Sequence, residues 1–81
     1  MKLWLISQDE NNNYDTYDSA VVAAETEDAA RNTLPSEYEE FGKRYGAWCS
    51  GPDKVKVELI GTAKKGTKAG VICASFKALH W

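Results

Sequence analysis

One stretch of the chain, residues 20–31, places a strand and a helix in immediate succession. The run from Ala20 to Ala24 is apolar and predicts a strand that stops at Glu25. Thr26 is a suitable helix N-cap because its hydroxyl can accept a hydrogen bond from a free backbone N–H. An 81-residue chain has room for one core only. The junction therefore predicts a single α+β domain spanning residues 1–81, with a sheet and a helix as its two layers.

Two strands are predicted in the first third of the chain. Residues 2–7 favour a strand with apolar side chains on both faces, as expected of a strand that is central or covered on both sides. The Asn-rich run 9–13 favours a turn. Residues 16–25 are then expected to return antiparallel to the first strand. The helix that follows must end before Pro35, because the residue before a proline disfavours the helical conformation.

The middle of the chain predicts a second helical segment. Ser36 and Glu39 have the spacing of a capping box. The aromatic residues Tyr38, Phe41 and Tyr45 fall three and four positions apart, which puts them on one helical face. Such a stripe is favoured as core packing over a platform for stacking bases. Glycines at 42 and 46 limit this helix to roughly three turns.

The last third of the chain predicts two more strands. Residues 54–59 alternate strictly, with Val55, Val57 and Leu59 on one face and charged residues on the other. Residues 71–76 are expected to pair with them as a hairpin through a lysine-containing loop. The predicted architecture is ββαββ, a mainly antiparallel four-stranded sheet with short helices on one face. Trp48 is expected to pack on that sheet.

The sequence carries little that indicates catalysis or metal binding. Cys49, Cys73 and His80 are scattered, whereas a zinc site needs about four ligands with recognisable spacing. Cys73 is interpreted as a small buried hydrophobe. A single histidine near the C-terminus does not suggest a catalytic triad. We therefore expect a protein that is not an enzyme and that uses no cofactor and no metal.

The N-terminal apolar run is too short for a signal peptide, and no apolar run approaches the length of a membrane helix. The expected location is the cytoplasm, without membrane contact.

Charge is unevenly distributed along the chain. The net charge is −2, but residues 1–53 carry a balance of −7 and residues 54–81 a balance of +5. Either the two halves neutralise each other in the fold, or each presents a charged surface to a partner. The acidic candidates for partner binding are Asp15, Asp18, Glu27, Asp28, Glu37, Glu39 and Glu40. The basic candidates for partner or DNA binding are Lys54, Lys56, Lys64, Lys65 and Lys68, which could form one patch.

Four segments considered together resemble a known group of proteins. They are KLWLISQ at 2–8, YDTYDSAVVAAE at 14–25, VELIGTA at 57–63 and GVICASF at 70–76. They resemble a family of small phage and prophage proteins, expected to include anti-CRISPR inhibitors of type I surveillance complexes. The resemblance covers both ends of the chain but not residues 32–53. It implies a protein of the bacterial host cytoplasm that works by stoichiometric binding. No family binding residue is carried over to this chain.

The leading functional hypothesis is therefore an anti-CRISPR protein that binds a type I complex (Cascade) and interferes with target DNA binding. The acidic surface would mimic DNA on a protein subunit, or the lysines would capture DNA nonspecifically near the complex. One alternative is a small nucleic-acid-binding regulatory protein of a phage, although the net negative charge is unfavourable for it. Another is an oligomeric anti-defence protein that sequesters a small molecule.

Overall fold

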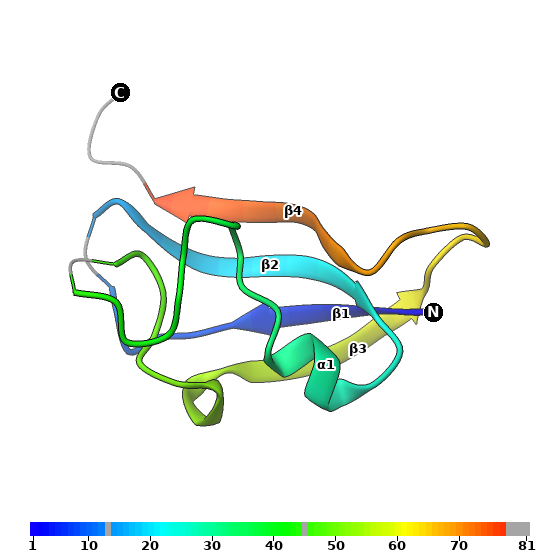
Figure 1. Ribbon diagram of the computed structural model, residues 1–81, viewed down its shortest axis with the longest axis horizontal. Coiled ribbons are helices and arrows are strands. Elements are labelled where there is room, and N and C mark those ends of the chain that lie inside the picture. The colour runs from blue at the N-terminus through cyan, green and yellow to red at the C-terminus, as the bar shows by residue number, and fades with distance from the viewer. Residues whose placement is uncertain (13, 45, 78–81) are drawn as a thin grey trace.

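The computed structural model describes residues 1–12, 14–44 and 46–77 (Figure 1). Its elements, in chain order, are β1 (Lys2–Ser7), β2 (Thr16–Ala24), the helix α1 (Glu27–Arg31), the 3-10 turn η1 (Pro52–Lys54), β3 (Lys56–Thr62) and β4 (Gly70–Lys77). The four strands form one antiparallel sheet. The domain is therefore mostly sheet, with little helix. Neither helical element is long and apolar enough to cross a membrane.

The order of the strands differs from the predicted hairpin of the last two strands. The order is β3-β1-β2-β4, so β3 and β4 form the two edges of the sheet and do not pair with each other. The lysine-containing loop, residues 63–69, instead connects the two edges past the ends of β1 and β2 (Figure 1). The prediction that β1 is central is confirmed. In this position both edges of β1 are paired, with β3 and with β2, and Trp4 and Ile6 on one face are buried while Leu3 and Leu5 on the other are half-buried.

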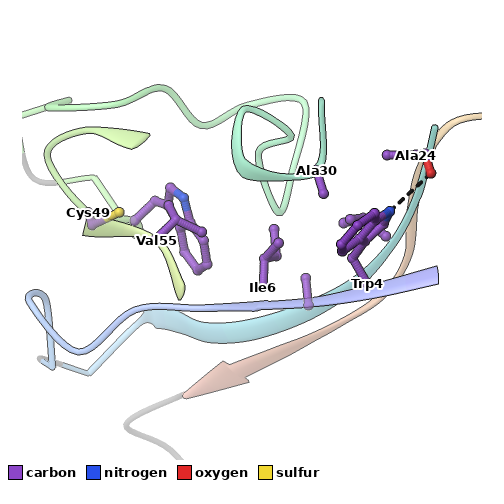
Figure 2. Close-up of a cluster of buried hydrophobic side chains, with 9 residues drawn as sticks. Trp4, Ile6, Ala24, Ala30, Cys49 and Val55 are labelled. Carbon is purple, nitrogen blue, oxygen red and sulfur yellow. Dashed lines mark hydrogen bonds between the residues drawn. The ribbon is translucent and has the colours of Figure 1, made fainter. Parts of the chain in front are cut away.

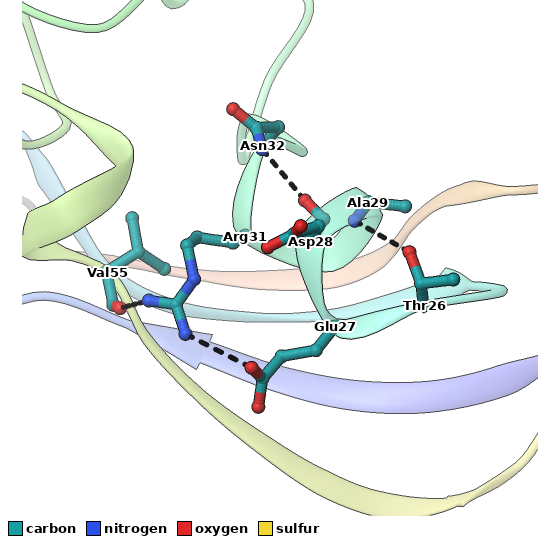
Figure 3. Close-up of polar contacts among 7 residues, drawn as sticks. All are labelled: Thr26, Glu27, Asp28, Ala29, Arg31, Asn32 and Val55. Carbon is teal, nitrogen blue, oxygen red and sulfur yellow. Dashed lines mark hydrogen bonds and ion pairs between the residues drawn. The ribbon is translucent and has the colours of Figure 1, made fainter.

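The first two strands and the helix follow the sequence prediction. β1 and β2 pair antiparallel with Leu5 opposite Val21. The Thr26 hydroxyl accepts a hydrogen bond of 3.1 Å from the Ala29 N–H, which is the N-cap bond predicted for this helix start (Figure 3). At the other end of α1, Arg31 donates to the Val55 carbonyl at 2.5 Å. The helix is thereby tied to the segment that leads into β3.

The predicted second helix does not form. Residues 32–51, which we call the covering segment, contain turns and bends but no helix among the residues described, which exclude Tyr45. The Ser36 hydroxyl accepts from the nearby Tyr38 N–H at 3.2 Å, but the Glu39 carboxylate reaches the distant Ala47 N–H at 2.7 Å. Tyr38 is exposed, whereas Phe41 packs against the core, so these two aromatic residues do not share a buried face.

Polar side chains from outside the covering segment hold it in its non-helical path. The Asn11 amide donates to the Gly46 and Trp48 carbonyls at 2.9 and 3.2 Å. Gly42 has a φ of +71°, a left-handed conformation that interrupts a helix and is easily adopted by glycine. These tertiary hydrogen bonds satisfy the Gly46 and Trp48 carbonyls, which lie at or beyond the end of the predicted helix and would have no partner within it. The weak helical preference of a segment with two glycines is therefore overridden.

The core lies between one face of the sheet and the layer formed by α1 and the covering segment (Figure 2). From the sheet it includes Trp4 and Ile6, and from the covering segment Trp48 and Cys49. The indole N–H of Trp4 donates to the Ala24 carbonyl at 3.0 Å. Trp48 therefore packs on the sheet as predicted.

Two expectations for the last two strands are corrected. Cys73, predicted to be buried, is exposed, because it lies on an edge strand and on the face of the sheet opposite the core. Lys54 belongs to η1 and not to a strand. Val55, just before β3, is buried and Val57 packs against the core, but Leu59 at the middle of the strand is 54% exposed. Alternation identified the side of the strand but not the extent of its cover.

Candidate interaction surfaces

Four of the acidic candidates come from the start of β2 and from the covering segment, two parts of the chain that a hydrogen bond joins. The Tyr17 N–H donates to the Ala47 carbonyl at 2.8 Å, which joins the covering segment to the first residues of β2. Asp15 immediately precedes β2 and Asp18 is its third residue, whereas Glu37 and Glu40 belong to the covering segment. We call these four residues, all exposed, the acidic surface. Asp15 has a φ of 62°, which aspartate tolerates in turns.

The other three acidic candidates have different environments. Glu39 is partly buried and accepts the Ala47 N–H, so its carboxylate is used to hold the covering segment. Glu27 and Asp28 lie on α1 beyond the other end of β2, a strand of nine residues that spans about 30 Å. Glu27 forms an ion pair with Arg31 at 3.6 Å (Figure 3). The seven acidic candidates therefore do not form one continuous surface.

Two acidic residues with clear structural roles were not singled out from the sequence. Asp9 forms an ion pair with Lys56 at 3.5 Å. The Glu10 carboxylate accepts from the Ser50 N–H at 2.7 Å and from the Ser50 hydroxyl at 3.0 Å, and these hydrogen bonds lower the pKa of Glu10. Both residues fall in the predicted turn 9–13. The sequence offered no sign that this turn would meet a segment 40 residues away.

The basic candidates are divided between two places. Lys54 and Lys56 lie at the start of β3, where Lys56 pairs with Asp9. Lys64, Lys65 and Lys68 lie in the loop beyond the end of β3, and all three are exposed. The seven residues of β3 separate the two groups by roughly 20 Å. The structure thus presents a lysine loop, residues 63–69, in place of the single patch considered from the sequence.

A further candidate surface is the face of the sheet opposite the core, which no described element covers. By alternation with buried Trp4 and Ile6, this open face carries Leu3, Leu5 and Ser7 of β1. The strand register extends these residues into rows across the sheet. One row is polar and one mainly apolar: Lys56–Ser7–Ser19–Ser75 and Glu58–Leu5–Val21–Cys73.

Metal-ligating side chains and the two cysteines bear on the sequence predictions for metal binding and catalysis. No group of three or more histidine, cysteine or acidic side chains with metal-binding geometry occurs in residues 1–12, 14–44 and 46–77. Burial raises the pKa of the Cys49 thiol, which keeps it protonated and weakly nucleophilic. His80 lies outside the described residues. The arrangement presents three candidate contact surfaces: the acidic surface, the lysine loop and the open face.

Comparison of the chain with protein-family models, with curated proteins and with solved structures gives no match.

Proposed function

We propose that this protein acts by stoichiometric binding, as an anti-CRISPR inhibitor that occupies a nucleic-acid-binding surface of a type I surveillance complex. The observation that carries the proposal is the acidic surface of Asp15, Asp18, Glu37 and Glu40, whose side chains are all exposed. The resemblance of four sequence segments to small phage proteins selects the class of partner.

The physical argument is that of a phosphate mimic. A basic channel that binds DNA attracts any surface with clustered negative charge, because complementary potentials steer association and favour one docking register. The acidic surface joins β2 to the covering segment through the hydrogen bond between Tyr17 and Ala47. Carboxylates on such an anchored framework lose less conformational freedom on binding than carboxylates on a free loop.

Binding of the purified protein to a purified type I complex tests the proposal. A variant with D15N, D18N, E37Q and E40Q keeps the shape of each side chain but removes its charge. We expect this variant to bind the complex about 100-fold more weakly, if each charge contributes about 0.7 kcal/mol. The matched control, K54Q/K64Q/K65Q/K68Q, removes four positive charges elsewhere and should retain inhibition.

The readouts are co-elution with the complex and inhibition of target DNA binding. A protein that neither co-elutes with a type I complex nor restores phage plating would contradict the proposal entirely. Loss of inhibition in the lysine variant, with the acidic variant unaffected, would instead assign the effect to DNA capture by lysines.

The lysine loop favours a second candidate function, direct nucleic-acid binding. Lys64, Lys65 and Lys68 are exposed within one short loop and could contact phosphates. Such binding weakens steeply as salt rises. Gel shifts with DNA and RNA at low and moderate salt test it, and no shift at low salt would exclude it.

A further inference from the structure

No element among the described residues covers either face of the edge strand β4. All six side chains from Val71 to Phe76 are exposed, with Ile72 at 52% and Phe76 at 48%. None of them belongs to the core cluster. No charged residue occurs between Gly70 and Phe76. A neutral, apolar edge strand with unpaired backbone groups is a template for pairing with another strand.

The opposite edge of the sheet differs in the property that matters for pairing. β3 carries Lys56 and Glu58, and Lys56 is held by Asp9 at 3.5 Å. Charged side chains on an edge strand hinder the approach of another strand. The two edges therefore have different capacities for association, and β4 is the edge that remains available.

We propose that β4 is a homodimer contact, in which the β4 strands of two copies pair antiparallel and join the two sheets into one. A two-fold axis makes such a contact self-complementary, because the same patch is used by both copies. A strand without charged residues over six positions meets no like charge when it pairs with itself. This inference does not rest on the proposed function.

Charge complementarity selects a second copy as the occupant and antiparallel as the direction. The lysine loop directly precedes β4, whereas the other end of β4 lies beside the start of β2, with Tyr17 opposite Phe76. That end carries Asp15 and Asp18. Antiparallel pairing brings the lysine loop of each copy to the acidic end of the other copy.

The lateral separation is compatible with attraction. The start of β2 in one copy would lie two strand spacings from β4 of the other copy, about 10 Å. This distance is close to the screening length at physiological salt, and lysine side chains shorten it further. Asp15 and Asp18 carry −2 at the acidic end, whereas the three lysines of the loop carry +3. A parallel arrangement would place like ends together.

The symmetry also restricts the register. A two-fold axis perpendicular to the joined sheet maps each face of the sheet onto itself. Directly opposed residues of antiparallel strands also point to the same face, so two opposed residues must be an even number of positions apart in the sequence. The axis therefore passes beside one residue of β4, which lies opposite the same residue of the other copy. The ladder to β2 shifts register at Ile72, so the regular part of the free edge begins at Cys73. The residues able to occupy the axis are therefore Cys73, Ala74 and Ser75.

Sedimentation equilibrium of the full chain, from micromolar to millimolar concentration, tests the dimer. We expect a concentration-dependent mass that rises toward twice the 9.0 kDa of the chain. Ile72→Lys should abolish the rise. Leu59→Lys is the matched control, because Leu59 is 54% exposed on the other edge while Ile72 is 52% exposed on this one. A monomeric mass throughout would overturn the proposal, as would dissociation caused by Leu59→Lys and not by Ile72→Lys.

Cysteine crosslinking provides a measurement that does not depend on Ile72. Directly opposed residues of antiparallel strands have Cα atoms about 4.5–5.5 Å apart, within disulfide range. Three proteins are compared: the native chain with Cys73, and two variants in a Cys73→Ser background with a cysteine at position 74 or at position 75. Each is oxidised with copper phenanthroline and oxygen, which accept the electrons of the thiols. One position should give a disulfide-linked dimer. Cys73→Ser alone, which retains buried Cys49, should give none. The absence of crosslinking at all three positions would contradict β4 pairing.

A charge swap tests the direction of pairing. Asp15→Lys with Asp18→Lys makes both ends of β4 basic and should weaken the dimer by roughly tenfold. Adding Lys64→Glu, Lys65→Glu and Lys68→Glu to this variant makes the loop end acidic and the β2 end basic. Opposite charges then meet again, and dimer formation should be restored. Failure of the second set to restore association would remove the charge argument for an antiparallel homodimer.

Discussion

Two short segments of similar composition have opposite fates in this fold. Residues 20–24 of β2 read Ala-Val-Val-Ala-Ala, and residues 71–75 of β4 read Val-Ile-Cys-Ala-Ser. All of the first are buried or half-buried, and all of the second are exposed. The segments are neighbours in the sheet, with Val21 opposite Cys73. β2 is flanked by β1 and β4, whereas β4 is an edge strand, so burial here is set by the position of the strand in the sheet and not by its residues.

The two cysteines give the largest expected contrast. Cys49 lies in the core and burial raises its thiol pKa, whereas Cys73 is exposed on β4. One thiol should react with an aromatic disulfide reagent in the native protein, and both after unfolding. Because reaction of Cys49 requires opening of the core, its rate should be at least about 1,000-fold slower, for a stability of about 5 kcal/mol. The measurement is done at low protein concentration, and equal rates would show that the covering segment opens freely.

The paired substitutions Ile6→Ala and Ile72→Ala compare one residue type in both environments. Ile6 is 0% exposed in β1, so its truncation should lower the free energy of unfolding by about 2–5 kcal/mol. Ile72 is half exposed on β4, so Ile72→Ala should lower the free energy of unfolding of the monomer by less than about 0.5 kcal/mol. Urea unfolding at low concentration measures both. Similar losses would mean that β4 is covered in solution.

Asn11→Ala tests whether the covering segment depends on its tertiary hydrogen bonds. Removal of the amide leaves the Gly46 and Trp48 carbonyls without this donor, so the loss of unfolding free energy should be about 1–3 kcal/mol. Asn12→Ala is the control, because the exposed Asn12 amide donates within its own turn, to the Asp9 carbonyl. An equal effect of the two substitutions would show that the turn, and not its contact with the covering segment, matters.

Acidification should produce the smallest effect. Hydrogen bonds from Ser50 lower the pKa of Glu10 in the folded state below its ordinary value of 4.5. A depressed pKa means that the carboxylate stabilises the fold above pH 4.5, and that this contribution is lost as the pH falls through the lower, folded-state pKa. Thermal unfolding between neutral pH and pH 3 should therefore show a small loss below pH 4.5. Glu10→Gln should lack that component, and an unchanged profile would contradict the assigned bond.

Local patterns were sufficient for the elements with local causes. The apolar run of 20–24 and the Thr26 cap predicted β2 and α1, because a strand preference and a capping bond each depend on adjacent residues. Of the candidate residues, the sequence identified which were charged, and the structure found most of them exposed. The sequence did not distinguish Glu39, whose carboxylate holds the covering segment, from Glu37 and Glu40. That role depends on a hydrogen-bond partner eight residues away, the Ala47 N–H.

The sequence by itself determined four strands, a capped helix and a chain with an acidic half and a basic half. Only the tertiary structure decided that β3 and β4 are opposite edges and that the covering segment, where it is described (32–44 and 46–51), contains no helix. Backbone preference and alternation act over a few residues, and the local conformations that they favour differ in free energy by small amounts. Strand order and cover depend on contacts between distant segments, such as Glu10 with Ser50 and Trp48 with the sheet. Their combined free energy exceeds the local preferences and leaves β4 exposed.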